Sequence, residues 1–168
     1  GMYIRRGSQG RFFNHVVANF FNRGFALDGP VCVTQFRRDS LFVRNSLFFV
    51  KANGATNGAT SYARFTGFTS SNVTDSAGFA ADFNSRTSLS GGAWQNKVGD
   101  PNFVSVNYDN PVNGTMPNLR VQAGSPALTG AATPPNDGFF ATNATYMGAF
   151  GDANSTNWME GWTTWFRP

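Results

Sequence analysis

The residues of this sequence whose side chains are best suited to binding or chemistry are three arginines and three tryptophans. They are Arg37, Arg38, Arg44, Trp158, Trp162 and Trp165. Arginine binds carboxylates through a planar fork of donors, and an arginine with a perturbed pKa can act as the base of a polysaccharide lyase. Such a lyase also holds Ca²⁺ through several carboxylates, but Asp28 and Asp39 are the only acids near these arginines. We therefore treat the arginines as candidates for binding an acidic ligand and assign no catalytic residue.

The tryptophans follow a helical spacing. Trp158, Trp162 and Trp165 fall at positions i, i+4 and i+7, which share one face of an α-helix. Asn157 is a suitable N-cap residue for this helix, and Glu160 three residues later completes the pattern of a capping box. An exposed face of three indoles would be a platform for stacking sugars, whereas a buried face would be an apolar lid. We favour the lid and keep the three residues as binding candidates.

The remaining reactive side chains predict no further site. Cys32 is the single cysteine, so it has no disulfide partner and no second thiolate for a metal. We expect it to be buried, and we expect His15 to be a packing or solvated residue. No Asp-Asp or Asp-x-Asp pair occurs that would suit a glycoside hydrolase. The sequence therefore predicts no metal site and no cofactor.

The composition favours short β-strands over long helices. The 168 residues include 18 Phe and 19 Gly, whereas only 13% are charged. Exposed helix faces usually carry Glu and Lys, but the chain has one Glu and two Lys. We predict an all-β protein with a largely neutral polar surface.

A short apolar pattern occurs twice in the first fifty residues. The segments 11–21 and 42–50 align when Asn14 is placed on Asn45, which gives a period of 31 residues. A period of this length built on β-type segments is typical of a solenoid, in which each coil buries its apolar face against the next. We predict that these segments pair in parallel and that the two Asn amides stack as a ladder.

The chain is predicted to be a single domain, 1–168, with three parts. Residues 1–50 form the coils, and their strands include 31–34. Residues 51–99 form a loop-rich excursion over these coils. Residues 100–168 form the last coils, with a strand at 145–151, and end in a Trp-rich cap. The opening Gly1-Met2 followed by a β pattern suggests a fragment of a longer chain.

The charge is unevenly distributed. Residues 1–51 contain eight Arg and Lys against two Asp, whereas the remainder contains five basic and seven acidic residues. This asymmetry suits an acidic partner, although arginine also commonly decorates exposed strand positions, and we favour this second interpretation. Nucleic acid is a disfavoured partner. No run of 18 apolar residues is present, so we expect no membrane span.

Two blocks of sequence resemble a known family. The segment 118–130, which contains Ser125-Pro126-Ala127-Leu128, is similar to a segment near the C-terminus of bacterial right-handed parallel β-helix proteins of pectate-lyase-like fold. Residues 138–140, 146–150 and 158–162 resemble the closing part of uncharacterised secreted or surface members. The resemblance implies a right-handed, single-stranded parallel β-helix of few coils, exported to the cell surface, periplasm or medium.

The functional prediction follows from this resemblance and from the scarcity of carboxylates. We predict a non-catalytic exported module for surface adhesion or glycan binding, with a polysaccharide or cell-surface glycan as partner. The alternative is a fragment of a polysaccharide lyase or hydrolase whose active site lies mostly upstream. We also predict self-association through the open N-terminal coil, because exposed strand edges and apolar surface promote pairing.

Overall fold

The computed structural model describes residues 1–19, 25–49, 63–66, 94–106, 116–161 and 163. These residues form ten strands and two short helices. The elements are β1 (Met2–Arg5), β2 (Gly10–Phe13), β3 (Val16–Ala18), β4 (Phe25–Asp28), α1 (Pro30–Arg37), β5 (Leu41–Arg44), β6 (Leu47–Phe49), β7 (Ala63–Thr66), β8 (Lys97–Val98), β9 (Phe103–Ser105), β10 (Asn118–Val121) and the 3₁₀-helix η1 (Pro126–Leu128).

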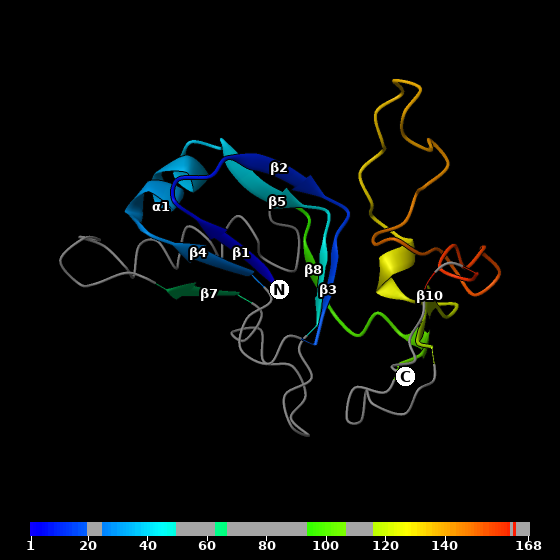
Figure 1. Ribbon diagram of the computed structural model, residues 1–168. Coiled ribbons are helices and arrows are strands. Elements are labelled where there is room, and N and C mark those ends of the chain that lie inside the picture. The colour runs from blue at the N-terminus through cyan, green and yellow to red at the C-terminus, as the bar shows by residue number, and fades with distance from the viewer. Residues whose placement is uncertain (20–24, 50–62, 67–93, 107–115, 162, 164–168) are drawn as a thin grey trace.

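The first eight strands form three small parallel sheets, with strand orders β1-β4-β7, β2-β5 and β3-β6-β8 (Figure 1). Each sheet takes one strand from successive passes of the chain. We call β1, β2 and β3 the first pass, β4, β5 and β6 the second pass, and β7 and β8 the third pass. Strands β7 and β8 come from the region 51–99, so the described part of that region joins the sheets.

The predicted 31-residue register is confirmed for two of these sheets. Phe12 lies opposite Val43 and Val16 lies opposite Leu47, both in parallel pairs. The chain bends at Asn14 between β2 and β3 and at Asn45 between β5 and β6, with φ angles of 58° and 50°. Asparagine tolerates this left-handed conformation better than most residues, and the bend separates one continuous apolar segment into strands of two different sheets.

The predicted amide ladder between the two asparagines is replaced by other contacts. The Asn45 side-chain amide donates to the Oε1 atom of Gln95 at 3.0 Å, and Gln95 occupies the same bend position with φ of 52°. Asn14 instead exchanges two hydrogen bonds with the backbone of Ala132, at 2.7 and 2.8 Å. The asparagines therefore fasten other parts of the chain to the bend.

The predicted strand at 31–34 is wrong, because these residues belong to helix α1. Pro30 occupies the first helical turn, where its fixed φ is favourable and its missing N–H costs nothing. Cys32, Val33 and Phe36 are buried at a helical spacing, so packing of this face overrides the β-propensity of the valines. The expected burial of Cys32 is confirmed, and its Sγ atom accepts a hydrogen bond from the Gly7 backbone N–H at 3.2 Å.

The prediction of a right-handed single-stranded parallel β-helix is wrong. Such a fold needs long sheets that run continuously from coil to coil, whereas each sheet of the described residues has two or three strands of at most four residues. The connection from β4 to β5 contains helix α1, and β9 and β10 pair in an antiparallel manner. The predicted strand at 145–151 is also wrong, because this segment consists of bends and residues without regular secondary structure.

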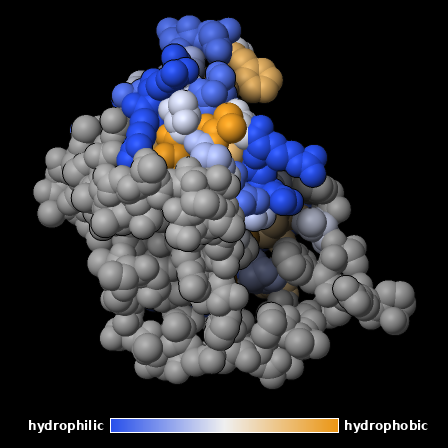
Figure 2. Space-filling model, turned by 90° about the vertical axis from the view of Figure 1, so that its left-hand side faces the viewer, coloured by the Kyte–Doolittle hydropathy of each residue, from blue (hydrophilic) through white to orange (hydrophobic). Residues whose placement is uncertain are grey.

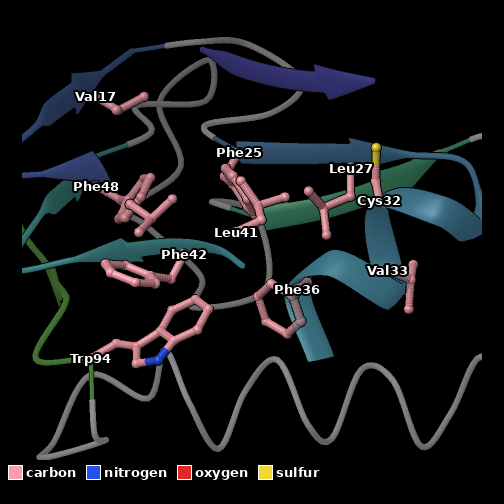
Figure 3. Close-up of a cluster of buried hydrophobic side chains, with 11 residues drawn as sticks. Val17, Phe25, Leu27, Cys32, Val33, Phe36, Leu41, Phe42, Phe48 and Trp94 are labelled. Carbon is pink, nitrogen blue, oxygen red and sulfur yellow. The ribbon is translucent and has the colours of Figure 1, made fainter. Parts of the chain in front are cut away.

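The core lies between the parallel sheets and helix α1. Buried residues of the second pass dominate it, together with Trp94 (Figure 3). The Trp94 ring packs on Phe36 with centroids 4.9 Å apart and on Phe42 with centroids 6.1 Å apart. Burial of large aromatic rings contributes much of the stability of such a small core.

A second cluster connects the sheets to the C-terminal segment, which begins at β9. Leu47 of β6 packs with Val121, Ala127 and Met147. The Nζ atom of Lys97 adds a polar clamp, because it donates to the backbone O atoms of Pro126 and Thr129 and to the Thr129 hydroxyl. The C-terminal segment is thus held against β3, β6 and β8.

Candidate functional site

The structure does not bring the predicted binding residues together. Arg37 is in the last turn of α1 and Arg38 follows it, whereas Trp158 belongs to the C-terminal segment on the opposite side of the view in Figure 1. Arg44 ends strand β5, between these two regions. Trp162 and Trp165 lie outside the described residues. Any site must therefore be built from one of these regions alone.

The face around α1 is mainly hydrophilic. Figure 2 views the molecule from this side and shows hydrophilic residues around a few hydrophobic ones. Arg37 and Arg38 are exposed at the C-terminal end of the helix, where a positive charge is favoured by the helix dipole. The Arg38 backbone N–H also closes the helix on the carbonyls of Thr34 and Phe36. Both residues thus have a role in ending the helix.

Trp158 forms an exposed aromatic surface. Its indole stacks on the Phe150 ring with an interplanar angle of 7° and a centroid distance of 5.1 Å. Phe150 is buried, whereas 46% of Trp158 remains exposed. The indole Nε1 donates a hydrogen bond to the Ala149 backbone O at 2.9 Å. One face of the indole is therefore fixed to the protein while much of the residue is open to solvent.

The turns around Trp158 are held by side chains of their own segment. The Asp152 carboxylate accepts hydrogen bonds from the Asn154 backbone N–H and the Ser155 hydroxyl. Arg120 of β10 reaches across to donate to the Ser155 backbone O at 3.0 Å. These contacts fix the loop that presents the indole.

The predicted helix through the tryptophans is wrong in its described part. Residues 158–161 form turns, and the Asn157 amide donates to the Glu160 carboxylate at 3.0 Å. The backbone N–H of Glu160 donates to the Asn157 carbonyl. The two residues of the expected capping box do meet, but they close a turn. The favoured role of a buried lid does not apply to Trp158, because its ring is partly exposed.

An apolar pocket lies beside this stack. Its volume is about 140 Å³, which exceeds what a single water needs. The lining residues come from β3, β9, β10 and the segment 147–150, and they are Val16, Phe103, Leu119, Val121, Met147, Gly148, Ala149 and Phe150. Phe150 thus contributes both to the pocket and to the support of the Trp158 indole.

Gly148 allows the segment 147–150 to approach strand β3. Its φ of 90° is accessible mainly to glycine, and its backbone N–H donates to the Asn14 carbonyl at 2.6 Å. A Cβ atom at this position would lie 2.9 Å from a methyl carbon of Val16. The pocket therefore depends on a glycine where β3 and the C-terminal segment meet.

The titratable groups of the described residues form no recognisable catalytic centre. Burial lowers the pKa of His15, whose ring lies near Phe12 at a centroid distance of 5.9 Å. The hydroxyl of Tyr3 and the guanidinium of Arg5 both donate to Asp28, and these bonds lower the pKa of that carboxyl. In the part of the chain that the structure describes, no three His, Cys, Asp or Glu side chains are grouped so that they could hold a metal ion.

Comparisons with known proteins give no relative: no protein family, curated protein or solved structure matches the chain. Within the described residues, no helix has the length and apolar character needed to cross a bilayer.

Sequence reasoning identified Trp158 but missed its partner and its pocket. Phe150 precedes Trp158 by eight residues, and side chains that far apart would not touch each other along a single helix or strand. The pocket residues come from four separate segments, and this arrangement depends on how the C-terminal segment packs on β3. The apolar side chains of residues such as Val16 and Val121 were the signal for this pocket in the sequence. Apolar character indicates that a residue is buried, but it does not indicate a pocket.

Proposed function

We propose that this chain is a non-catalytic module that binds glycans through the exposed part of Trp158. The observation that carries the proposal is the indole that is stacked flat on Phe150 and hydrogen-bonded to Ala149 while it remains 46% exposed. Sugar rings present C–H groups on one face, and these groups pack favourably on the electron-rich face of an indole. An aromatic ring that is already fixed loses little conformational entropy when a ligand binds.

The neighbouring pocket suits a small apolar substituent of the glycan. It is lined by aliphatic and aromatic side chains and one glycine, and it shares Phe150 with the platform. A methyl or acetyl group attached to a sugar could occupy such a pocket while the ring stacks on Trp158. Apolar pockets with an adjacent oriented contact are typical of small-ligand sites.

The experiment is a glycan-binding screen followed by titration calorimetry on the chain and its variants. Replacing Trp158 with alanine should reduce the affinity for the best glycan by up to about tenfold, because an aromatic stacking contact is worth roughly 0.5–1.5 kcal/mol beyond the area that it buries. Trp158→Phe should retain part of the affinity. Phe140→Ala is the matched control, because Phe140 is half exposed on the loop 136–143 and does not line the pocket. Equal losses for Phe140→Ala and Trp158→Ala would disprove the proposal.

The proposal includes export of the module and contact with a cell-surface glycan. Export is supported by the resemblance of residues 138–140, 146–150 and 158–162 to secreted or surface proteins and by a sequence with few charged residues. Fractionation of cells that produce the full-length gene product tests this part, and recovery in the cytoplasm alone would contradict it.

We further propose that two copies associate through the strands of the first pass. Within the described residues, β1 and β2 have a partner strand on one side only, whereas the C-terminal segment lies against β3. Ile4 and Phe12 are partly exposed, whereas the residues opposite them in the second pass are fully buried. Unpaired strands with apolar side chains favour pairing with another chain. A light-scattering mass that rises toward a dimer with concentration is expected, and a monomeric mass at all concentrations would exclude this contact.

A further inference from the structure

Cations and aromatic rings alternate on one face of the β2–β5 sheet. In the parallel register Arg11 lies opposite Phe42, and Phe13 lies opposite Arg44. Side chains two residues apart on a strand share a face, so these four side chains belong to the same side of the sheet.

The two guanidinium groups are both stacked against the Phe42 ring. The guanidinium carbon of Arg44 is 4.3 Å from the ring centroid, and that of Arg11 is 5.8 Å from it. Arg44 also lies 6.0 Å from the Trp94 ring. Phe13 meets Phe42 edge to face and is 41% exposed. The aromatic core thus orients the arginines, and cation–π attraction lowers the cost of holding them.

The two arginines have no acidic partner among the described residues. Among the residues that the structure describes, neither Arg11 nor Arg44 forms an ion pair with a carboxylate. The Nε atom of Arg44 is buried and donates no hydrogen bond within that part of the chain. This donor is shielded from solvent, so a ligand would reach Arg44 through the terminal nitrogens of its guanidinium group.

We propose that Arg11 and Arg44 form an oxyanion site that takes the carboxylate of an acidic sugar, with Phe13 against the sugar ring. A carboxylate matches the donor fork of arginine in a bidentate manner. The choice of a sugar as the carrier of the carboxylate rests on the proposed glycan-binding function, but the site is separate from Trp158.

The number of cations favours a single acidic group over a nucleic acid. A nucleic-acid site usually neutralises several phosphates, and its affinity falls steeply with salt because counterions are released. Two guanidinium groups on this face would neutralise about two phosphates. They are sufficient for one carboxylate of a sugar, which Arg44 can hold while Arg11 adds charge.

The experiment follows the arginine Nε–H signals of the whole chain by NMR during titration with sodium glucuronate at constant ionic strength. The Arg44 signal should move and saturate with glucuronate, and it should stay unchanged with glucose. Sodium glutamate is a second arm that separates an acidic sugar from any carboxylate, and a short single-stranded DNA is a third. No shift with glucuronate, an equal response to glutamate, or tighter binding of the DNA would each overturn the proposal.

Variants test the two arginines separately. Arg44→Lys keeps the charge but removes the fork and the Nε donor, so the affinity for glucuronate should fall by about tenfold. Arg11→Gln changes an exposed residue, and it should weaken binding even if Arg44→Lys does not fold. Arg6→Gln is the control, because it removes one exposed positive charge from the turn before β2. A loss as large for Arg6→Gln as for Arg11→Gln would show that only the net charge matters and would reject the site.

Discussion

Replacement of Asn96 by alanine should destabilise the protein more than any exposed polar substitution. Asn96 is buried just before β8, and its side chain bridges two backbone groups of the second pass. Its Oδ1 atom accepts from the Ser46 backbone N–H at 3.0 Å, and its Nδ2 atom donates to the Val43 carbonyl at 2.8 Å. The substitution removes both partners at once.

The expected loss follows from the two groups left behind. A buried backbone donor or acceptor without a partner costs roughly 1–3 kcal/mol. Ser46 and Val43 are both buried, so water reaches their backbone groups poorly. We expect Asn96→Ala to lower the free energy of unfolding by about 2–4 kcal/mol, which is a large share of the roughly 5–15 kcal/mol that holds a typical domain together.

Urea unfolding followed by circular dichroism measures this difference. Asn154→Ala is the matched control, because Asn154 is exposed and its hydrogen bond to Asp152 is donated by its backbone N–H, which the substitution keeps. The control should change the free energy of unfolding by less than about 0.5 kcal/mol. If Asn96→Ala and Asn154→Ala gave the same small change, the bridging role of Asn96 would be refuted.

Three further substitutions have defined outcomes. Lys97→Met removes the bonds from Nζ to Pro126 and Thr129 and should lower the free energy of unfolding by about 1–3 kcal/mol in urea titrations. Burial lowers the pKa of His15, so the unfolded state binds more protons and stability should fall as the pH drops below 6.5; His15→Gln should remove this dependence in thermal melts. Hydrogen bonds from Tyr3 and Arg5 lower the pKa of Asp28, so its contribution is present above about pH 3.8 and is lost as the pH falls through the folded pKa; the melting temperature of Asp28→Asn should depend less on pH in that range.

The sequence predicted the local pairing of the first two passes but not the complete fold. Asn14 and Asn45 are residues that tolerate positive φ, and both are followed by apolar pairs, so their equivalence was visible without coordinates. The same alignment placed Phe12 opposite Val43. Local conformational preference and core packing agree at these positions, and this agreement makes a register readable from sequence.

Helix α1 could not be read from strand propensity. Val31 and Val33 favour strands, but Cys32, Val33 and Phe36 pack against the sheets only at a helical spacing. Pro30 is the local signal for a helix start, because proline is favoured in the first helical turn. Tertiary packing decided the outcome, as it often does for short apolar segments.

The candidate sites were only partly visible. Arg44 and Trp158 were singled out because of their residue types, whereas Arg11 was counted with the general positive charge. The alternation Arg11-x-Phe13 and Phe42-x-Arg44 places a cation and a ring on the same face of two strands, and it becomes meaningful once the 31-residue register is applied. The support of Trp158 by Phe150 has no such periodic signal, because it depends on irregular turns.

The unequal spacing of paired strands explains why a true local register led to a wrong global fold. Residues 31 apart pair in β2–β5 and β3–β6, but residues 23 apart pair in β1–β4 and residues 38 apart pair in β4–β7. The spacing of 31 exceeds the spacing of 23 by eight residues, which is the length of α1. The second pass therefore resembles the first pass with a helix added between its first two strands. Packing keeps the strands aligned despite this addition, because Leu27 and Val43 remain buried on either side of it. A repeat read from one pair of segments therefore fixes the register of those segments, and it cannot fix how many strands each sheet contains or what connects them.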